Sequence, residues 1–428
     1  MPRERAWMNK VAAAGFVGAL LEWYDFYIFA TGSALVFGQV FFPDQDPLAS
    51  TMAAFGAFAA GFVARPLGGV LFGHIGDRIG RKASLVATLV IIGIGTFLVG
   101  LLPSFDAVGI LAPALLVLLR VVQGIGLGGE YGGASLITIE HAPRAERGFW
   151  GSLPQAASPA GLLLATGVFG LVSLLPGGQF LAWGWRVPFL LSAVALAIGL
   201  YIRLSVDETP EFARSRPKRE ERAPALELLR AHRRNTLLSI GARLAETVSG
   251  NTIKSFGLTY VTLQLGLARE MALDGLVLTG AIAIVATPIF GALGDRFRPR
   301  HVYMLGAALA AVLAFPFFWV LDWRTPLAVW LGFVVAYNLG PTMMLSVQPS
   351  LFVQLFDPRV RYTGLSIAYQ VSSIVGGFTP LIALWLLRLL DGRPWGVAAF
   401  LAVIAVVSFC CTSAAVRRER GRDRPDLR

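Results

Sequence analysis

A succession of long apolar runs is the feature of this sequence that most constrains its fold. A helix needs about 20 apolar residues to cross the hydrocarbon core of a bilayer. Only 15% of the residues are charged, well below the roughly 25% of an average soluble domain. The long runs lie at residues 11–40, 48–74, 84–103, 108–139, 148–174, 183–205, 235–264, 273–292, 301–321, 326–353, 363–388 and 396–416. The chain is therefore predicted to be an all-α, polytopic membrane protein with twelve transmembrane helices in the lipid bilayer.

The charge balance is strongly basic, with 37 Lys and Arg against 26 Asp and Glu. Such a balance could indicate a nucleic-acid partner, but the basic residues flank apolar runs, where orientation in a membrane explains them. One alternating set of segments between the runs carries 28 Lys and Arg residues, and the other carries five. Because positive loops stay on the cytoplasmic side, both termini are predicted to be cytoplasmic, in a multi-pass protein of the plasma (cell inner) membrane with no nucleic-acid partner.

The long connection at residues 206–234 holds charges of both signs. It is interpreted as a solvated cytoplasmic linker that separates two units of six helices. These units are residues 1–205 and residues 235–428, the second with a short cytoplasmic tail. Trp183 and Trp185 begin the sixth run, so we expect both to anchor that run at the membrane interface.

The two predicted units repeat each other in sequence. The segment 73–82, which contains Asp77, corresponds to the segment 291–300, which contains Asp295, at an offset of 218 residues. Pro143 and Gln155 correspond to Pro358 and Gln370 at an offset of 215. Two motifs at nearly one offset indicate a duplicated unit with parallel topology, which is typical of transporters. The fold is therefore predicted to consist of two pseudo-symmetric six-helix bundles.

Several motifs carry a resemblance to a known family. The Gly-x-x-x-Asp-Arg-x-Gly-Arg-Lys loop at 73–82 resembles the cytoplasmic loop motif of the major facilitator superfamily, and Arg-Val-Val-Gln-Gly at 120–124 resembles that superfamily's motif in the fourth helix. The segments 22–26 and 128–133 are similar to its metabolite:proton symporter family, and the segments 183–189, 361–371 and 376–380 to the shikimate transporter branch. The resemblance implies the major facilitator fold, a proton-coupled symporter for a small organic acid, and a monomer.

Eight charged residues lie inside the predicted spans, where a charge is costly and is a functional candidate by default. Seven of the eight belong to the first, fourth and seventh spans, which line the central cavity in the superfamily that the chain resembles. The acids are Glu22, Asp25, Glu130 and Glu246, and the bases are Arg65, Arg120, Arg243 and Lys254.

The seventh span presents Arg243, Glu246 and Lys254 on one helix face, because their spacings are multiples of about one turn. We expect Arg243 or Lys254 to bind the carboxylate of an anionic substrate, with Glu246 orienting that cation or accepting a substrate hydroxyl. Alternatively, Lys254 only neutralises Glu246. The remaining predicted substrate-binding residues are polar and uncharged: Asn251, Tyr337, Asn338, Gln348, Tyr24, Gln123 and Gln155.

Proton coupling is assigned to Asp25 and Arg120, which resemble the acid–arginine pair of proton-coupled members of the superfamily. Separation of such a pair would leave a carboxylate in low dielectric, which favours uptake of a proton. Glu22 and Glu130 are predicted to share this role. The alternatives are a static Asp25–Arg120 salt bridge, a structural partner role for Glu130, and snorkelling of Arg65 to the membrane surface.

The duplicated loops are predicted to form a cytoplasmic gate, because carboxylates there can accept hydrogen bonds from helix N-termini and arginines in one conformation only. Alternatively, these charges only set the topology. The gate residues are Asp77, Arg78, Arg81, Arg144, Asp295 and Arg296.

Other classes of function lack a signal in this sequence. There is no nucleophile–base set, no metal-ligand spacing and no phosphate-binding loop, since the glycines at 124–128 lie inside a span. We therefore predict neither an enzyme nor a cofactor or metal. The substrate is predicted to be shikimate or a similar hydroxylated carboxylate. The alternatives are a dicarboxylate such as 2-oxoglutarate, or a zwitterionic osmolyte, whose transporters often carry a longer C-terminal extension than the twelve residues after 416.

Overall fold

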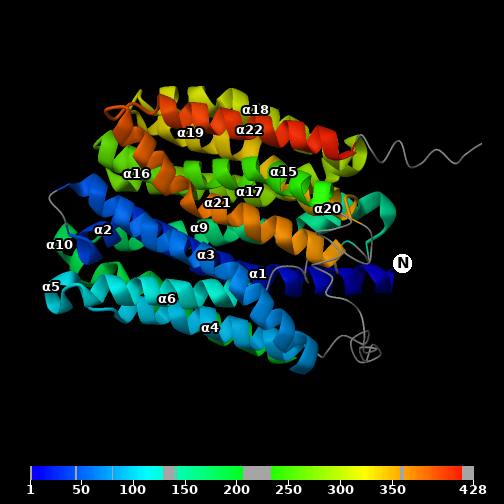
Figure 1. Ribbon diagram of the computed structural model, residues 1–428, viewed down its shortest axis with the longest axis horizontal. Coiled ribbons are helices and arrows are strands. Elements are labelled where there is room, and N and C mark those ends of the chain that lie inside the picture. Colours follow the sequence, from blue (N-terminus) through cyan, green and yellow to red (C-terminus); the bar gives the residue numbers. More distant parts are fainter. Residues whose placement is uncertain are drawn as a thin grey trace, which may run out of the picture.

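The computed structural model describes residues 2–43, 46–79, 81–128, 139, 142–205, 233–356 and 361–416. These residues form an elongated bundle of helices that run roughly along one common axis (Figure 1). The N-terminus of the first helix and the end of the last described helix lie at the same end of the bundle (Figure 1). These two ends lie on the same side because a chain that crosses the bundle an even number of times returns to the side where it began.

The first half of the chain contains six spans. The first four are α1 (Pro2–Leu35), α3 (Pro47–Ile79), α4 (Arg81–Leu101) and α6 (Leu111–Gly128), and the short helices α2 (Phe37–Phe41) and α5 (Phe105–Val108) lie in their connections. The fifth is made of η1 (Arg144–Glu146), α8 (Arg147–Ser152), η2 (Pro154–Ala156) and α9 (Ala157–Ser173). The sixth is made of α10 (Gly177–Gln179), η3 (Phe180–Gly184), α11 (Arg186–Leu190) and α12 (Ser192–Ser205).

The second half repeats this arrangement. The seventh span is α15 (Arg233–Asn251), η4 (Thr252–Phe256), α16 (Gly257–Thr259) and η5 (Tyr260–Gln264). The eighth and ninth are α17 (Arg269–Phe297) and α18 (Pro299–Leu321). The tenth is α19 (Pro326–Tyr337), η6 (Asn338–Thr342) and α20 (Met343–Val353), and the last two are α21 (Arg361–Leu389) and α22 (Trp395–Val416). The segments η3, η4, η5 and η6 are π-helical turns.

The predicted twelve-helix fold is confirmed. Nine helices in the described part of the chain are long and apolar enough to cross a membrane, and α4 contributes a shorter apolar helix at Val86–Leu101. The other two spans begin with α1 and α15, and each of these helices carries an intramembrane acid together with a second charge, such as Glu22 with Asp25 and Arg243 with Glu246, so their apolar character is interrupted. The predicted linker falls almost entirely on residues 206–232, outside the described residues, and the domain division stays a prediction.

The sequence duplication is repeated in the helix packing. In the first half, α1 packs against α9, α3 against α6, and α4 against α12. The corresponding pairs in the second half, α15 with α21, α17 with α19, and α18 with α22, also pack together. Between the halves, α9 packs on α17 and α3 packs on α21, so the interface itself has the pseudo-twofold arrangement.

Glycines set the closest helix approach in the first half, between α3 and α6. A Cβ at Gly124 would collide with the carbonyl of Gly61, and one at Gly68 would collide with the carbonyl of Ile125. Small residues let helix backbones come together in lipid, where there is no hydrophobic driving force between helices. This approach brings the Arg120 side chain directly beside Gly61, in the interior of the half.

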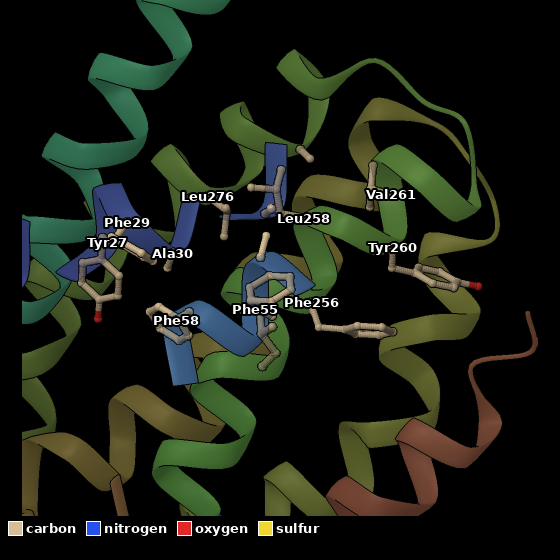
Figure 2. Packing of buried hydrophobic residues seen from close by; sticks show 14 of the residues in the cluster. Tyr27, Phe29, Ala30, Phe55, Phe58, Phe256, Leu258, Tyr260, Val261 and Leu276 are labelled. Carbon is tan, nitrogen blue, oxygen red and sulfur yellow. The ribbon is translucent and has the colours of Figure 1, made fainter. Parts of the chain in front are cut away.

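A hydrophobic cluster extends from the first half into the second (Figure 2). Phe29, Phe55 and Phe58 come from α1 and α3, and Phe256 and Leu258 come from the seventh span; none is more than 1% exposed. Aromatic side chains contribute a large buried area and favourable edge-to-face contacts. The two halves are therefore packed tightly together along this part of their interface.

One local prediction is wrong. Trp183 is 49% exposed, as an interfacial anchor would be, but Trp185 is fully buried. Its ring packs edge-on against Phe37 and Phe41. The guanidinium of Arg186 lies over the same ring, 4.5 Å from its centroid. The sequence could not separate the two tryptophans, because Phe37 and Phe41, which help to bury Trp185, are more than 140 residues away.

Candidate functional site

Seven of the eight predicted intramembrane charges are described by the structure, and all are at least partly buried. Glu130 lies outside the described residues. Asp25, Arg65, Arg120, Arg243 and Lys254 are at most 9% exposed. Charges this deep need partners inside the protein, and the partners differ from one residue to the next.

Arg243 on α15 is fixed to α21. Its Nη1 donates hydrogen bonds to the carbonyl of Tyr369 at 3.0 Å, to Oγ of Ser372 at 2.6 Å and to Oγ of Ser373 at 3.0 Å. The guanidinium stacks on the Tyr369 ring, 3.5 Å from its centroid, and Nη2 lies 3.7 Å from Oε2 of Glu246. Arg243 therefore braces the seventh span against the eleventh within the second half.

Lys254 has a different set of partners. It lies on the π-helical turn η4, a feature that is frequent at functional sites. Its Nζ donates to the hydroxyl of Tyr27 at 2.8 Å and lies 3.4 Å from that of Tyr337. In the described part of the chain no carboxylate forms an ion pair with Lys254, although Glu246 lies within electrostatic range of it. The alternative that Lys254 only neutralises Glu246 stays a prediction. The hydrogen-bond partners of the ammonium group are neutral hydroxyl groups.

The Lys254 contact crosses from the second half to the first. Tyr27 is on α1, and its hydroxyl lies 2.7 Å from Oγ of Ser158 on α9. Both residues are 2% exposed. The ring of Tyr27 stacks on that of Trp23 and lies at the edge of the aromatic cluster (Figure 2). Lys254, Tyr27, Ser158 and Tyr337 thus form a polar centre between the halves.

Arg120, in the first half, is held mainly by aromatic faces. Its guanidinium lies 4.4 Å from the ring centroid of Phe29 and 5.0 Å from that of Phe58, an arrangement with a cation–π attraction. Its Nη1 lies 3.4 Å from Oε1 of Gln123, whose own Nε2 donates to Oγ1 of Thr96 at 2.8 Å. Gln123 therefore positions the arginine inside the half.

Asp25, the other member of the predicted acid–arginine pair, is 8% exposed on α1. Thr96 is the hydroxyl group beside its carboxyl, and Arg120 and Glu22 lie within electrostatic range. Its Oδ1 is buried and has no hydrogen-bond partner among the described residues, whose ion pairs include no Asp25–Arg120 contact. The predicted static salt bridge is thus not formed in this conformation.

Arg65 does not extend to the membrane surface. It is 6% exposed, and its guanidinium lies 4.3 Å from the ring centroid of Phe62 and 5.9 Å from that of Phe26. The predicted snorkelling of this side chain is therefore wrong. Arg65 and Arg120 share an aromatic environment inside the first half, since Arg120 is also 5.9 Å from the Phe62 ring.

Two of the predicted neutral site residues have unpaired buried acceptors. The Nδ2 of Asn338 donates to the carbonyl of Val334 at 2.9 Å, while its Oδ1 has no partner within the described ranges. The Oε1 of Gln348 is likewise buried without a hydrogen bond to any described residue. Buried acceptors of this kind are uncommon and call for an explanation.

The other predicted neutral residues lie deeper within their own halves. The hydroxyl of Tyr24 donates to the carbonyl of Pro188 at 2.8 Å, which ties α1 to α11. The Nδ2 of Asn251 donates to the carbonyl of Gly376 at 2.8 Å, which ties α15 to α21. Gln155 is 8% exposed on η2.

At one end of the bundle, Asp295 on α17 joins the two halves. Its Oδ1 accepts a hydrogen bond from the backbone N–H of Gly148 at 2.6 Å, and its Oδ2 accepts one from that of Phe149 at 2.8 Å. These are the first N–H groups of α8, so the carboxylate caps a helix N-terminus and meets its positive dipole. The backbones come very close here, because a Cβ at Gly148 would collide with the carbonyl of Gly291.

The remaining gate residues are less defined. Arg296 is exposed, with its guanidinium 5.4 Å from the ring centroid of Phe297. The other predicted gate side chains lie outside the described side chains: Asp77, Arg78, Arg81 and Arg144. Among the predicted gate residues whose side chains are described, Asp295 is thus the one with a contact between the two halves.

The halves also meet at the opposite end of the bundle. Arg388 on α21 forms an exposed ion pair of 3.3 Å with Asp46, which precedes α3. Arg269, at the start of α17, donates from Nη2 to the carbonyl of Ser173 at 2.8 Å. Since the halves are in contact at both ends, the polar centre around Lys254 is enclosed between them.

Sequence analysis did not single out Tyr27 or Ser158. The only local signal for Tyr27 is its position one helical turn after Trp23 on a charged span. Ser158 has no local signal, because its partner is 131 residues away in the sequence. Ser372 and Ser373 accept hydrogen bonds from Arg243 and are separated from it by 129 and 130 residues in the sequence. They were missed for the same reason.

The sequence profile of the family described as "Sugar (and other) transporter" matches residues 11–231 and 218–422. The chain belongs to this family, which is part of the major facilitator superfamily, and it is a multi-pass membrane transporter and not an enzyme.

Curated relatives narrow the likeness further. The chain is 40% identical over 407 residues to the shikimate transporter of Escherichia coli K12, covering 94% of this chain and 92% of that one. It is 42% identical over 388 residues to the inner membrane metabolite transport protein YhjE of the same organism, covering 88% of each. It is 36% identical over 417 residues to the glycine betaine/proline/ectoine/pipecolic acid transporter OusA of Dickeya dadantii, covering 94% and 81%.

Solved structures show the same fold. A D-xylose-proton symporter superposes with a TM-score of 0.72 at 20% sequence identity, over 93% of this chain and 96% of that one. The partially occluded inward-open form of the xylose transporter XylE from E. coli gives 0.71 at 19% identity, over 98% of each chain.

Proposed function

We propose that this transporter is a proton-coupled symporter for a small organic acid, shikimate or a similar hydroxylated carboxylate. The observation that carries the proposal is Lys254: a buried cation between the two halves whose partners are neutral hydroxyl groups. Glu246 lies within electrostatic range of Lys254, but no described carboxylate is in direct contact with the ammonium group. A buried charge without a contacting counter-ion is costly, and a substrate carboxylate would supply that contact. The 40% identity to a shikimate transporter supports the same substrate class.

Lys254, and not Arg243, is the proposed carboxylate ligand. The Nη1 donors of Arg243 are occupied by α21, and its Nη2 faces Glu246. The partners of Lys254 are hydroxyls that can exchange one acceptor for another. The hydroxyl of Tyr337, on the tenth span, lies 3.4 Å from the Lys254 ammonium. Asn338 and Gln348, which have unpaired buried oxygens among the described residues, are proposed to supply further polar groups of the site. Arg243 and Glu246 then maintain the seventh span in place.

Asp25 is the proposed proton carrier, with Arg120 as its partner and Glu22 and Glu130 as further acids of the same half. Asp25 is buried, and in the described part of the chain its Oδ1 makes no hydrogen bond. A carboxylate held in low dielectric away from its cation favours the protonated form, whereas approach of Arg120 favours release. A movement that changes the Asp25–Arg120 distance would therefore couple proton binding to conformation.

The proposed cycle is alternating access of the two halves. Asp295 closes one end through helix α8, and the contacts of Arg388 and Arg269 close the other. The asymmetry of Lys and Arg assigns the Asp295 end, with both termini, to the cytoplasm. The linker at 206–234 would tether the halves while they move.

Uptake into proteoliposomes tests this function. The purified chain would be tested with labelled shikimate, 2-oxoglutarate and glycine betaine, each with and without an inward proton gradient. The proposal predicts accumulation of the hydroxylated monocarboxylate, dependent on the gradient and abolished by a protonophore. Preferential uptake of 2-oxoglutarate or glycine betaine would contradict the proposed substrate class. Equilibration of the substrate without dependence on the gradient would contradict the proposed proton coupling.

A further inference from the structure

The hydroxyl pair of Tyr27 and Ser158 is not explained by the proposed binding of a carboxylate at Lys254 alone. The two side chains come from different helices, α1 and α9, and meet at 2.7 Å with 2% exposure each. They face Lys254 from the opposite half of the molecule. Whatever binds between the halves at Lys254 must also contact, or displace, this pair.

The hydrogen bonds of this group leave one donor over. A lysine ammonium only donates, so the oxygen of Tyr27 accepts from Nζ of Lys254. Either hydroxyl of the Tyr27–Ser158 pair can donate to the other. In both cases the pair uses one of its two hydroxyl hydrogens, and the second has no acceptor among the hydrogen bonds of the described residues. The pair therefore retains one available donor.

The neighbouring turn supplies the opposite chemistry. Tyr337, whose hydroxyl lies 3.4 Å from Lys254, is followed directly by Asn338 on η6. The orientation of the Asn338 amide is set by its bond to Val334, so the group without a partner in the described structure is an oxygen. A donor from the Tyr27–Ser158 pair and an acceptor at Asn338 together match the chemistry of a hydroxyl group, which both accepts and donates.

We propose that Tyr27 and Ser158 are specificity-determining residues, which hold a hydroxyl group of the acid whose carboxylate binds Lys254. The inference rests on the proposed function and narrows its substrate class. A second carboxylate would add acceptors where the Asn338 oxygen needs a donor. A betaine has no O–H or N–H group to offer. A site built around a hydroxyl group discriminates strongly against a ligand that lacks it, because buried polar groups are left unpaired.

The test compares acids that differ only in their hydroxyl groups. The probes are shikimate against 1-cyclohexene-1-carboxylate, and lactate against propionate, as competitors of uptake in proteoliposomes. The variants are Tyr27→Phe, which keeps the ring stacked on Trp23, and Ser158→Ala. The matched control is Tyr303→Phe, since that buried hydroxyl bonds to the carbonyl of Ala242 away from the halves' interface.

In each pair that is transported, the wild-type protein should prefer the hydroxylated acid by about tenfold or more. Tyr27→Phe should reduce this ratio by about tenfold, Ser158→Ala should reduce it less, and Tyr303→Phe should leave it unchanged. The ratio is the informative quantity, because loss of the Lys254–Tyr27 bond acts equally on both acids of a pair and cancels.

An unchanged ratio in Tyr27→Phe, with acid uptake intact, would overturn the inference and leave the proposed function standing. Equal weakening of both acids would do the same, since it would assign Tyr27 to support of Lys254. Absence of uptake of every acid by the wild-type protein would overturn the proposed function itself.

Discussion

The two halves share one packing scheme but hold their buried charges in different ways. In the second half, Arg243 makes three hydrogen bonds to α21 and lies against Glu246. In the first half, Arg120 and Arg65 lie over phenylalanine rings, and within the described residues the Oδ1 of Asp25 has no hydrogen bond. A duplicated scaffold has thus been given two electrostatic environments.

The difference indicates a division of roles. A guanidinium whose Nη1 makes three hydrogen bonds and whose Nη2 lies near a carboxylate is fixed, which suits a structural brace for the span that carries Lys254. An arginine held by aromatic faces, near a carboxylate that it does not contact, can change its distance from that carboxylate at low cost. The second half is therefore suited to hold the substrate carboxylate, and the first half to hold the proton.

The largest effects are expected when the two cations of the seventh span are replaced separately. Lys254→Gln removes the charge that we assign to the substrate carboxylate, and the loss of a buried charge partner typically costs about 2 kcal/mol or more. Substrate affinity should fall by at least about 30-fold, while the thermal unfolding temperature of the detergent-solubilised protein stays near that of the wild type. Equilibrium binding and thermal melting on the same preparation measure both quantities.

Arg243→Gln is the contrasting variant. It leaves Glu246 buried without its cation and removes bonds to α21, a change that typically costs about 3 kcal/mol or more in stability. We expect a clear fall in unfolding temperature and in yield of folded protein. The assignment would be contradicted if Arg243→Gln were stable but lost substrate binding while Lys254→Gln bound normally. Arg243 would then be the carboxylate ligand and Lys254 the structural residue.

A smaller effect is expected from a substitution at Asp295, which should shift the equilibrium between the closed and open forms of that end. Asp295→Asn keeps one acceptor but loses the charge and one of the two bonds to the N-terminus of α8. Loss of a helix cap costs about 1 kcal/mol, so the closed population should fall about fivefold relative to the open one. Labelling of a cysteine placed at Ser152, which is fully buried in this conformation, would report the change when the reagent is added to the outer medium of inverted vesicles, which the cytoplasmic end faces.

The matched control lies at the other end of the bundle. Asp46→Asn removes an ion pair whose side chains are 57% and 42% exposed, and such pairs contribute about 0.2–1 kcal/mol. Its effect on labelling at the Asp295 end should stay within about twofold. Equal effects of the two variants would contradict the assignment of Asp295 as the main lock.

Much of the fold could be predicted from the sequence, because its determinants are local. Run length located the twelve spans, and the Asp77 and Asp295 motifs revealed the duplication that the packing repeats. The spacing of Arg243, Glu246 and Lys254 placed them on one helix. The π-helical turns were not predicted, because they add one residue per turn only where tertiary packing supports them.

The charged residues of the site could be predicted from the sequence, but their hydrogen-bond partners could not. An intramembrane charge is visible in one chain, but whether it is saturated depends on distant residues. Ser372 and Ser373 decide the role of Arg243, and Tyr27 decides the surroundings of Lys254. Side chains of Ser and Tyr are common enough in spans that their sequence positions carry no such information.

The central claim, that the first half carries the proton and the second half binds the substrate carboxylate, is tested most directly with Asp25→Asn. The measurement is uptake of labelled acid into proteoliposomes, once driven by a pH gradient and once by exchange against unlabelled acid inside. The account predicts loss of gradient-driven accumulation with exchange retained within about twofold, because the asparagine imitates the protonated carboxyl and leaves Lys254 in place. Full gradient-driven accumulation by Asp25→Asn would contradict the account.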